Sequence, residues 1–123
     1  MSPDEVAAYA LGKAGAWPDT PWENDRVAKV GPGAAGGKIF AFLGDDTVGV
    51  KCGNGRDGTA DEWLDRYPED ASVMAYIGRS GWNTLRIDGA IPDDEIREAV
   101  DQSYELVVAK LPRKHRPESG ESP

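Results

Sequence analysis

A chain of 123 residues with 39% hydrophobic and 29% charged residues fits one globular domain with an ordinary core, which excludes a disordered protein. It has no apolar run near the ~20 residues that span a bilayer, and its acidic N-terminus lacks the basic start of a signal peptide. We therefore expect a cytoplasmic protein without a membrane partner. The formal charge of −8 opposes polyanion binding by the chain as a whole. The single cysteine, Cys52, excludes an intrachain disulfide.

The beginning of the chain predicts a helix followed by an extended link. Ser2 and Glu5 form a capping-box pattern around Pro3, and the apolar spacing predicts a helix that ends near Gly15. The next segment, 16–25 (AWPDTPWEND), contains two prolines. It is interpreted as an extended or turning link.

Three strands are predicted next, over 25–30, 37–44 and 47–52. Each segment is short and rich in β-branched or aromatic residues, and turn residues separate it from its neighbours. The connections are too short for the crossover that parallel strands need, so the pairing should be antiparallel.

The second half of the chain again alternates helix and strand. A helix is predicted over 58–68, with Thr59 and Glu62 as a second capping box. Two further strands are predicted over 72–78 and 82–88, with a turn after the second.

A final helix begins at Pro92, carries acidic residues in its first turn and ends at Pro112. Its predicted buried stripe consists of Ile96, Ala99, Val100, Ser103, Leu106, Val107 and Leu111. We expect a single domain over 1–112 and a flexible polar tail over 113–123. The order α-β-β-β-α-β-β-α predicts an α+β fold, with an antiparallel sheet of about five strands and helices on one face.

The charges are segregated along the chain. The two predicted helical segments 57–70 and 88–105 carry six and seven acids respectively, with one base each. The strand segments 26–56 and 71–87 carry more bases than acids, and 110–116 carries four bases and no acid. Two interpretations stay open: solvated surface charge wherever the chain meets water, or a basic surface on the strands and tail.

Two glycine patterns match nucleotide-binding loops, but neither has the context of such a site. Residues 31–36 fit G-x-G-x-x-G and precede a strand rather than a helix. Residues 53–58 do open a helix, but acidic residues crowd the end where a phosphate would lie. We interpret the first pattern as a hairpin loop and the second as a turn into a helix.

Groups for catalysis and metal binding are sparse. His115 is the one histidine and lies in the predicted tail, and Cys52 alternates with apolar strand residues, which favours burial. The His and Cys clusters that hold zinc are missing from the sequence. We predict no enzyme activity, no catalytic residue, no metal and no cofactor.

Several segments together resemble the MmcQ/YjbR family of small bacterial proteins: PWENDRVAKV, GGKIFAFLG, VGVKC, RYP and GWNTLRIDGAIPDDEIREAVDQSYELVVAKLP. The resemblance covers about 3–112. Its most specific parts are Trp82-Asn83-Thr84, the Asp88-Gly89 turn and Ser103-Tyr104. The resemblance implies a CyaY-like, double-wing α+β fold and a DNA-binding function. The charge of −8 and the long loop GPGAAGG depart from what we expect of that family.

Charge segregation and the resemblance together favour a non-enzymatic protein that binds nucleic acid through its sheet side and basic tail. The expected phosphate contacts are Lys29, Lys38, Lys51, Arg79 and Arg86. Trp82 is expected to be a core residue, or a stacking partner for a base if it is exposed.

Two alternatives remain for this chain, for which a monomer is favoured. A protein–protein interaction adaptor should expose an apolar patch, for example around Trp17, Trp22 or Trp63. The frataxin-type relatives of the implied fold suggest instead weak metal binding on the acidic helices.

Overall fold

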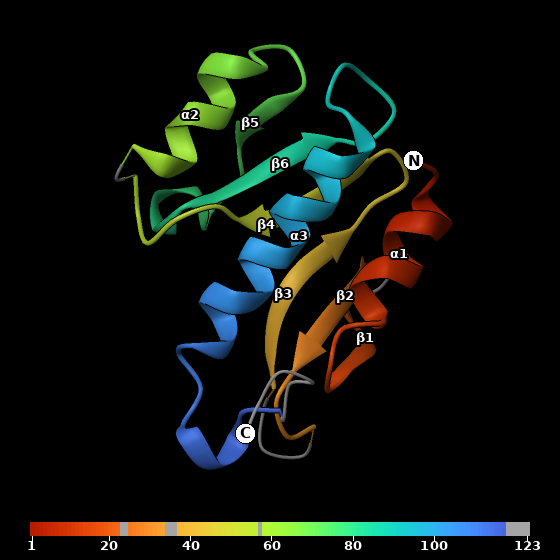
Figure 1. Cartoon of the computed structure of the whole chain (residues 1–123), viewed down its shortest axis with the longest axis vertical. Coiled ribbons are helices and arrows are strands. Elements are labelled where there is room, and N and C mark those ends of the chain that lie inside the picture. The colour runs from red at the N-terminus through yellow and green to blue at the C-terminus, as the bar shows by residue number, and fades with distance from the viewer. Residues whose placement is uncertain (23–24, 34–36, 57, 118–123) are drawn as a thin grey trace.

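The computed structural model describes residues 1–22, 25–33, 37–56 and 58–117. Its centre is one antiparallel sheet with the strand order β1-β2-β3-β4-β6-β5 (Figure 1). The strands are β1 (Ala16–Trp22), β2 (Asp25–Val30), β3 (Lys38–Leu43), β4 (Thr47–Lys51), β5 (Ala71–Val73) and β6 (Trp82–Arg86).

Three helices lie against one face of this sheet: α1 (Pro3–Leu11), α2 (Thr59–Arg66) and α3 (Asp93–Val108). α3 crosses β3 and β4, and α1 lies beside it (Figure 1). α2 covers the β5–β6 end, where the buried amide of Asn83 donates to the Ala60 carbonyl at 2.9 Å. The predicted α+β class, the antiparallel sheet and the helices on one face are therefore confirmed.

The sheet has six strands rather than about five, because 16–22 forms the edge strand β1 and not a link. β1 pairs with β2 from Ala16↔Val30 to Trp22↔Asp25. Its prolines, Pro18 and Pro21, have no N–H to donate, and an edge strand tolerates this because only one of its sides has a partner. From the sequence, the two prolines predict a break in this segment. Its pairing with β2 in the folded sheet makes it a strand.

The predicted strand 72–78 is also shorter than expected. β5 ends at Val73, and the chain then turns through Tyr76, whose φ is +67°, into the 3-10 turn η1 (Gly78–Ser80). Gly81 follows with φ +98° and leads into β6. The apolar residues after Val73 therefore belong to a loop, although their composition is typical of a strand.

The first predicted helix cap is confirmed and the second is wrong. Ser2 Oγ accepts from the Glu5 N–H at 3.1 Å, and the Glu5 carboxylate accepts from the Ser2 N–H at 2.8 Å. In α2 the N-cap is Gly58, with φ +99°, so Thr59 is the first helical residue rather than the cap.

Part of the predicted flexible tail has a defined structure. Residues Arg113–His115 form the 3-10 turn η2. The Arg116 guanidinium donates to the carbonyls of Leu111 and Ala109, which satisfies acceptors that the end of α3 leaves open. Residues 118–123 of the predicted tail lie outside the described residues.

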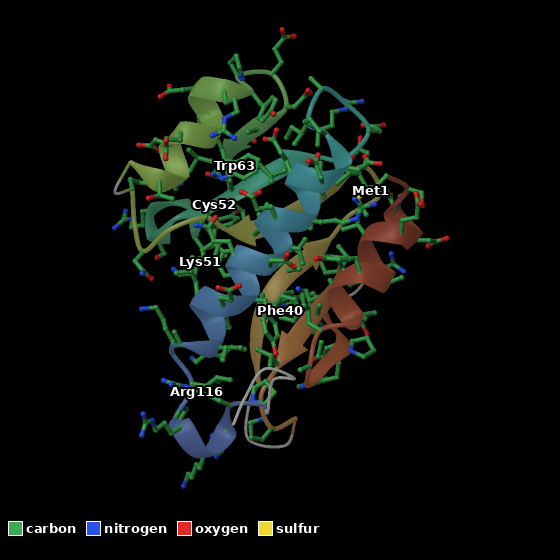
Figure 2. The ribbon with its side chains drawn as sticks, viewed as in Figure 1. Met1, Phe40, Lys51, Cys52, Trp63 and Arg116 are labelled. Carbon is green, nitrogen blue, oxygen red and sulfur yellow. The ribbon has the colours of Figure 1, made fainter. Side chains whose placement is uncertain are left out.

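β3 and β4 pair over only part of their length. Their pairs run from Leu43↔Val48 to Ala41↔Val50, and β3 bulges against β2 beyond Ala41. Past this point, Ser103 of α3 stands between the two strands. Its hydroxyl accepts from the Lys51 N–H at 2.8 Å and donates to the Phe40 carbonyl at 2.6 Å. Phe40 and Lys51 lie on either side of α3 (Figure 2), so a helix side chain replaces a missing bond between strands.

Replacing Ser103 with alanine should lower the free energy of unfolding by about 1–3 kcal/mol, because a buried N–H and a buried carbonyl lose their partner. The measurement is urea unfolding followed by circular dichroism. The matched control is Ser72→Ala at an exposed serine of β5, which should change stability by less than about 0.5 kcal/mol. Equal losses in the two variants would show that the Ser103 bridge contributes nothing.

Gly81→Ala should destabilise the protein more than Gly58→Ala. Both glycines have φ near +100°, so each alanine bears backbone strain of about 1–3 kcal/mol. A Cβ on Gly81 would also lie 2.1 Å from the Gly53 carbonyl oxygen, whereas one on Gly58 would meet nothing within 4 Å. The thermal midpoints of the two variants test the collision separately from the strain, and equal midpoints would refute it.

Candidate nucleic-acid interface

The separating ends of β3 and β4 border a cleft of about 450 Å3, which we call the lysine cleft. Strands from both halves of the sheet contribute to it, together with the C-terminal end of α3. Its basic residues are Lys29, Lys38, Lys51 and Lys110. Its apolar residues are Trp22, Ile39, Phe42, Ile77, Trp82 and Val107. No acidic residue occurs among the described residues that line it.

A second cleft of about 510 Å3, the loop cleft, adjoins the first. Lys51 and Lys110 line both clefts, and the loop cleft adds Arg79 together with Asn54 and Ser80. Its described lining is also without a carboxylate. Five bases from separate parts of the sequence therefore line two clefts that share Lys51 and Lys110. Four of them, Lys29, Lys38, Lys51 and Arg79, are among the five that the sequence nominated.

Two of these bases already have partners inside the protein. The Lys29 ammonium lies 2.8 Å from Asp19 Oδ2 and above the Trp17 ring. The hydrogen bond from Lys29 holds the pKa of the Asp19 carboxyl below its usual range. The Lys51 side chain is 7% exposed, and its ammonium donates to the Ser80 carbonyl at 2.7 Å. Lys51 thus supplies positive potential more than a free donor, and Asp19 offsets the charge of Lys29.

The other three bases of the clefts face solvent. Lys38 at the start of β3, Arg79 in η1 and Lys110 after α3 are all exposed. Within the described part of the chain they form no ion pair. These three side chains are therefore the ones able to reach an anion in the clefts.

Arg86, the fifth nominated base, lies elsewhere. It pairs with Thr47, which begins β4, whereas Lys51 ends that strand. The Arg86 Nε lies 2.8 Å from Asp88 Oδ1. The hydrogen bond to Asp88 raises the pKa of the Arg86 guanidinium, and the charge of Asp46 acts in the same direction. Arg86 is thus surrounded by carboxylates and does not join the clefts.

Trp82 is a core residue, as the first of its two predicted roles required. It is 8% exposed, and its ring packs edge-on against Phe42 with centroids 5.6 Å apart. Only its edge reaches the lysine cleft, so its face is not open to a stacked base. Trp22 on the edge strand is 55% exposed and lines the same cleft. The exposed aromatic ring of the site is therefore Trp22.

Sequence reasoning did not identify the roles of Lys110 and Arg56. In the sequence, Lys110 belongs to the basic segment 110–116 and no motif marks it as a site residue. Its place one residue before the buried Leu111 is a signal that it would lie near the sheet. Arg56 donates to Asp61, to the carbonyls of Gly78 and Trp82, and to the Asn83 side chain. It fastens the glycine-rich loop after β4, and no sequence pattern indicated this role.

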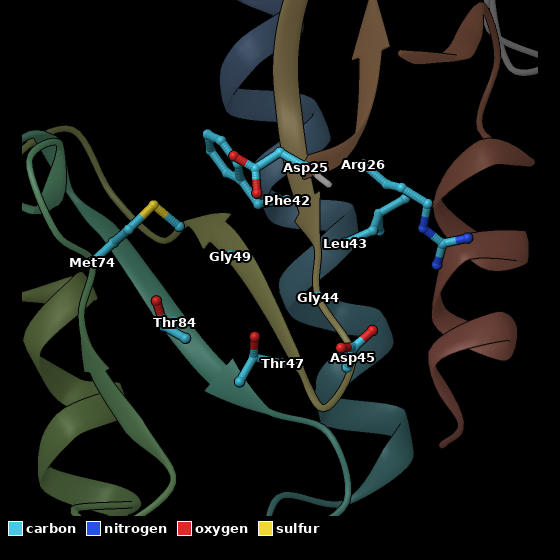
Figure 3. Close-up of a pocket in the computed structure, with 10 residues that line it drawn as sticks. All are labelled: Asp25, Arg26, Phe42, Leu43, Gly44, Asp45, Thr47, Gly49, Met74 and Thr84. Atoms are coloured by element: carbon cyan, nitrogen blue, oxygen red, sulfur yellow. The ribbon is translucent and has the colours of Figure 1, made fainter. Parts of the chain in front are cut away.

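Another hollow on the strand face, of about 260 Å3, has a different character (Figure 3). Asp25 and Asp45 line it together with Arg26, so it offers no surplus of positive charge. The Met74 side chain reaches over Gly49 toward Phe42. A Cβ on Gly49 would lie 2.0 Å from the Met74 methyl carbon, so the glycine makes room for this side chain.

The described residues contain no group of three or more His, Cys, Asp or Glu side chains placed to hold a metal ion. Cys52 is fully buried, and burial raises the pKa of its thiol to about 11. Its sulfur lies 3.7 Å from the Val50 carbonyl oxygen. The thiol is therefore protonated at neutral pH and inaccessible. Cys52 acts as a small buried apolar side chain, as its alternation with apolar strand residues predicts.

The Cys52 thiol should react with a disulfide reagent at pH 8 only after unfolding. With a pKa of about 11, only about one thiol in a thousand is ionised in the folded protein, and burial also blocks access. The rate of thionitrobenzoate release measures the reaction, and strong denaturant should restore an ordinary rate. Reaction of the native protein at the rate of a free thiol would contradict the burial of Cys52.

Of the three tryptophans named as possible places for an adaptor's apolar patch, Trp22 is exposed and the other two are not. Trp63 is 7% exposed, and Trp17 is half-buried with its Nε1 donating to the Gly31 carbonyl at 2.8 Å. The large exposed apolar side chains of the described residues are Trp22, Val73 and Tyr76. None of the described helices has the length and apolar character that crossing a bilayer requires.

The fold of an open-faced antiparallel sheet with helices on one side has solved counterparts. Protein DR2400 of Deinococcus radiodurans, described as a DUF419 domain, superposes with a TM-score of 0.82 at 20% identity, over 98% of this chain and 93% of that one. A Pseudomonas syringae protein gives 0.63 at 18% identity, over 87% and 99%. At these identities the likeness is one of fold.

The sequence comparison identifies the family. The model of the YjbR family matches residues 11–106, and the chain belongs to that family. The uncharacterized protein YjbR of Escherichia coli K12 is 33% identical over 55 residues, which are 45% of this chain and 47% of that protein. The same match is found in Escherichia coli O157:H7. The chain thus matches about half the length of these relatives, and the resemblance inferred from the sequence is confirmed.

Proposed function

We propose that this protein binds nucleic acid through the lysine and loop clefts, with Lys38, Arg79 and Lys110 contacting phosphates. The observation that carries the proposal is the convergence of five bases on two clefts that share lining residues, with no carboxylate in the described lining of either. These bases come from both halves of a chain whose net charge is −8. DNA is the nucleic acid that the MmcQ/YjbR resemblance implied.

The negative net charge is compatible with this proposal because salt limits the range of each charge. At physiological ionic strength the Debye length is about 8 Å, so a phosphate in a cleft responds mainly to the nearest side chains. The first turns of α2 and α3 hold Asp61, Glu62, Asp93, Asp94 and Glu95. None of these acids lines either cleft. The acids still repel a long duplex that extends past the clefts, which favours a short contact.

The bases have different roles in this proposal. Lys38, Arg79 and Lys110 are exposed and able to bond phosphate oxygens directly. Lys51 is held by the Ser80 carbonyl and adds positive potential to both clefts. The charge of Lys29 is offset by its ion pair with Asp19, so Lys29 contributes less. Arg86 is left out because Asp88 holds it at the far end of β4.

A protein partner is the second candidate function, and one observation favours it. Tyr76 is 101% exposed at φ +67°, and Val73 nearby in sequence is 51% exposed. A strained, fully exposed aromatic side chain in a loop is a feature of contact surfaces. This patch has no charge complementarity to indicate its partner, so nucleic-acid binding is the better-supported function.

The test measures fluorescence anisotropy of labelled DNA over about 20–150 mM salt, where phosphate contacts make affinity fall steeply. Each lysine that contacts a phosphate contributes about 0.7–0.9 to the slope of log affinity against log salt. Lys38→Gln combined with Lys110→Gln should therefore reduce the slope by about 1.5 and weaken binding. The matched control is Arg97→Gln, which neutralises an exposed base on the solvent side of α3.

We expect the double lysine variant to lose affinity for DNA and the Arg97 variant to keep the affinity of the wild type. Absence of binding at low salt would overturn the proposal. Equal effects of the two neutralisations would also overturn it, because they would indicate a diffuse charge effect rather than binding at the clefts.

A further inference from the structure

We infer that the lysine cleft takes an unpaired nucleotide strand rather than a duplex, with one base seated on its apolar floor and the flanking phosphates on its lysines. This inference rests on the proposed function and adds the class of nucleic acid. It combines two features of the same cleft, an apolar floor and a basic rim, of which phosphate binding alone uses only the second.

The floor consists of buried and half-buried apolar side chains, which contacts to phosphates alone would leave uncovered. Ile39 and Phe42 belong to β3, Trp82 to β6 and Val107 to α3, and Ile77 precedes η1. The rings of Phe42 and Trp82 are in edge contact. A cleft of about 450 Å3 with this lining has the size and apolar character of a small-ligand site. Each nucleobase has an apolar face that such a surface would remove from water.

The rim supplies the complementary charge around that floor. Lys38 and Lys110 reach the cleft from two separate elements, β3 and the turn after α3, and the buried Lys51 also lines it. The phosphates on either side of a seated base can therefore meet a cation on each side. The shared residues Lys51 and Lys110 then lead into the loop cleft and Arg79, which gives the strand a route for the following phosphate.

Trp22 adds a stacking surface at the mouth of the cleft. Its indole is 55% exposed although it belongs to a paired strand. Exposed aromatic side chains beside basic grooves stack on the bases of single strands. A base between the Trp22 ring and the floor would lose contact with water on both of its faces.

A duplex cannot use these features together. Its bases stay stacked and paired, so its phosphates could reach the lysines while the floor and Trp22 stayed uncovered. Placing a base on the floor would require it to be unstacked first, which costs free energy that a single strand does not lose. The geometry therefore favours single strands over duplex at equal charge.

The experiment compares wild-type binding to four labelled probes of equal length at about 150 mM salt: oligo-dT, oligo-rU, a DNA duplex and an abasic deoxyribose-phosphate oligomer. One stacked base should make oligo-dT bind at least about fivefold more tightly than the abasic oligomer. The duplex should bind more weakly than oligo-dT. The ratio of the affinities for oligo-rU and oligo-dT shows whether the protein prefers a single strand of RNA or of DNA.

Trp22→Ala should lower affinity for oligo-dT at least about fivefold and leave affinity for the abasic oligomer unchanged. Tyr76→Ala, which removes a fully exposed aromatic ring outside both clefts, is the matched control and should change neither affinity. Lys38→Gln should weaken both probes alike, because both carry the same phosphates.

The outcomes separate this inference from the function on which it rests. Duplex binding as tight as oligo-dT, or abasic binding as tight as oligo-dT, would overturn the inference and leave nucleic-acid binding at the clefts intact. Binding of no probe even at low salt would overturn both. The four-probe comparison uses the unaltered protein, so it decides the question even if a variant fails to fold.

Discussion

The hydroxyl of Ser103 connects β3 and β4 at the place where their own pairing stops. It accepts from the Lys51 N–H and donates to the Phe40 carbonyl, so neither buried backbone group is left without a partner. A helix side chain can replace the missing bond because α3 crosses the sheet at this point (Figure 2). The strands can therefore separate without loss of the core, and the lysine cleft opens beside the separation.

The same separation of β3 and β4 explains how basic residues from distant parts of the chain come to line one cleft. Lys38 begins β3 and Lys51 ends β4, so opening the two strands places both at one cleft. Lys110 joins them because the chain continues past the end of α3 on the same side. The acids in the first turns of α2 and α3 lie at helix N-termini, where the helix dipole favours negative charge. The acids thus lie at the starts of two helices, and the bases gather where the strands separate.

The loop around the second cleft is held by interactions of a different kind. Arg56 binds Asp61 and three acceptors in the 78–83 region, and Gly81 approaches the Gly53 carbonyl so closely that a side chain would not fit. These contacts bring the glycine-rich loop after β4 against η1, where Arg79 lies. The described part of the loop that matched a nucleotide-binding pattern therefore has a structural role, and Gly81 opposite it permits the close backbone packing.

Local sequence patterns predicted most of the elements of this protein but not their limits at the edges. Alternation and turn residues identified β2, β3, β4 and β6, and apolar spacing identified α3, because these signals depend on neighbours in the chain. The prolines of β1 concealed an edge strand, and the apolar run after Val73 suggested a strand where a loop forms. Both errors concern whether a segment finds a neighbouring strand to pair with in the folded sheet. The sequence of the segment alone does not contain that information.

The sequence by itself determined the α+β class, the YjbR family and the basic residues from which a site could be formed. Tertiary structure alone decided which of them meet: Lys29, Lys38, Lys51 and Arg79 gather with Lys110, while Arg86 is held by Asp88 and Trp82 is buried. The physical reason is that a charge acts over about 8 Å in physiological salt. Separation in space determines a site, and the folded sheet sets this separation between residues far apart in the chain.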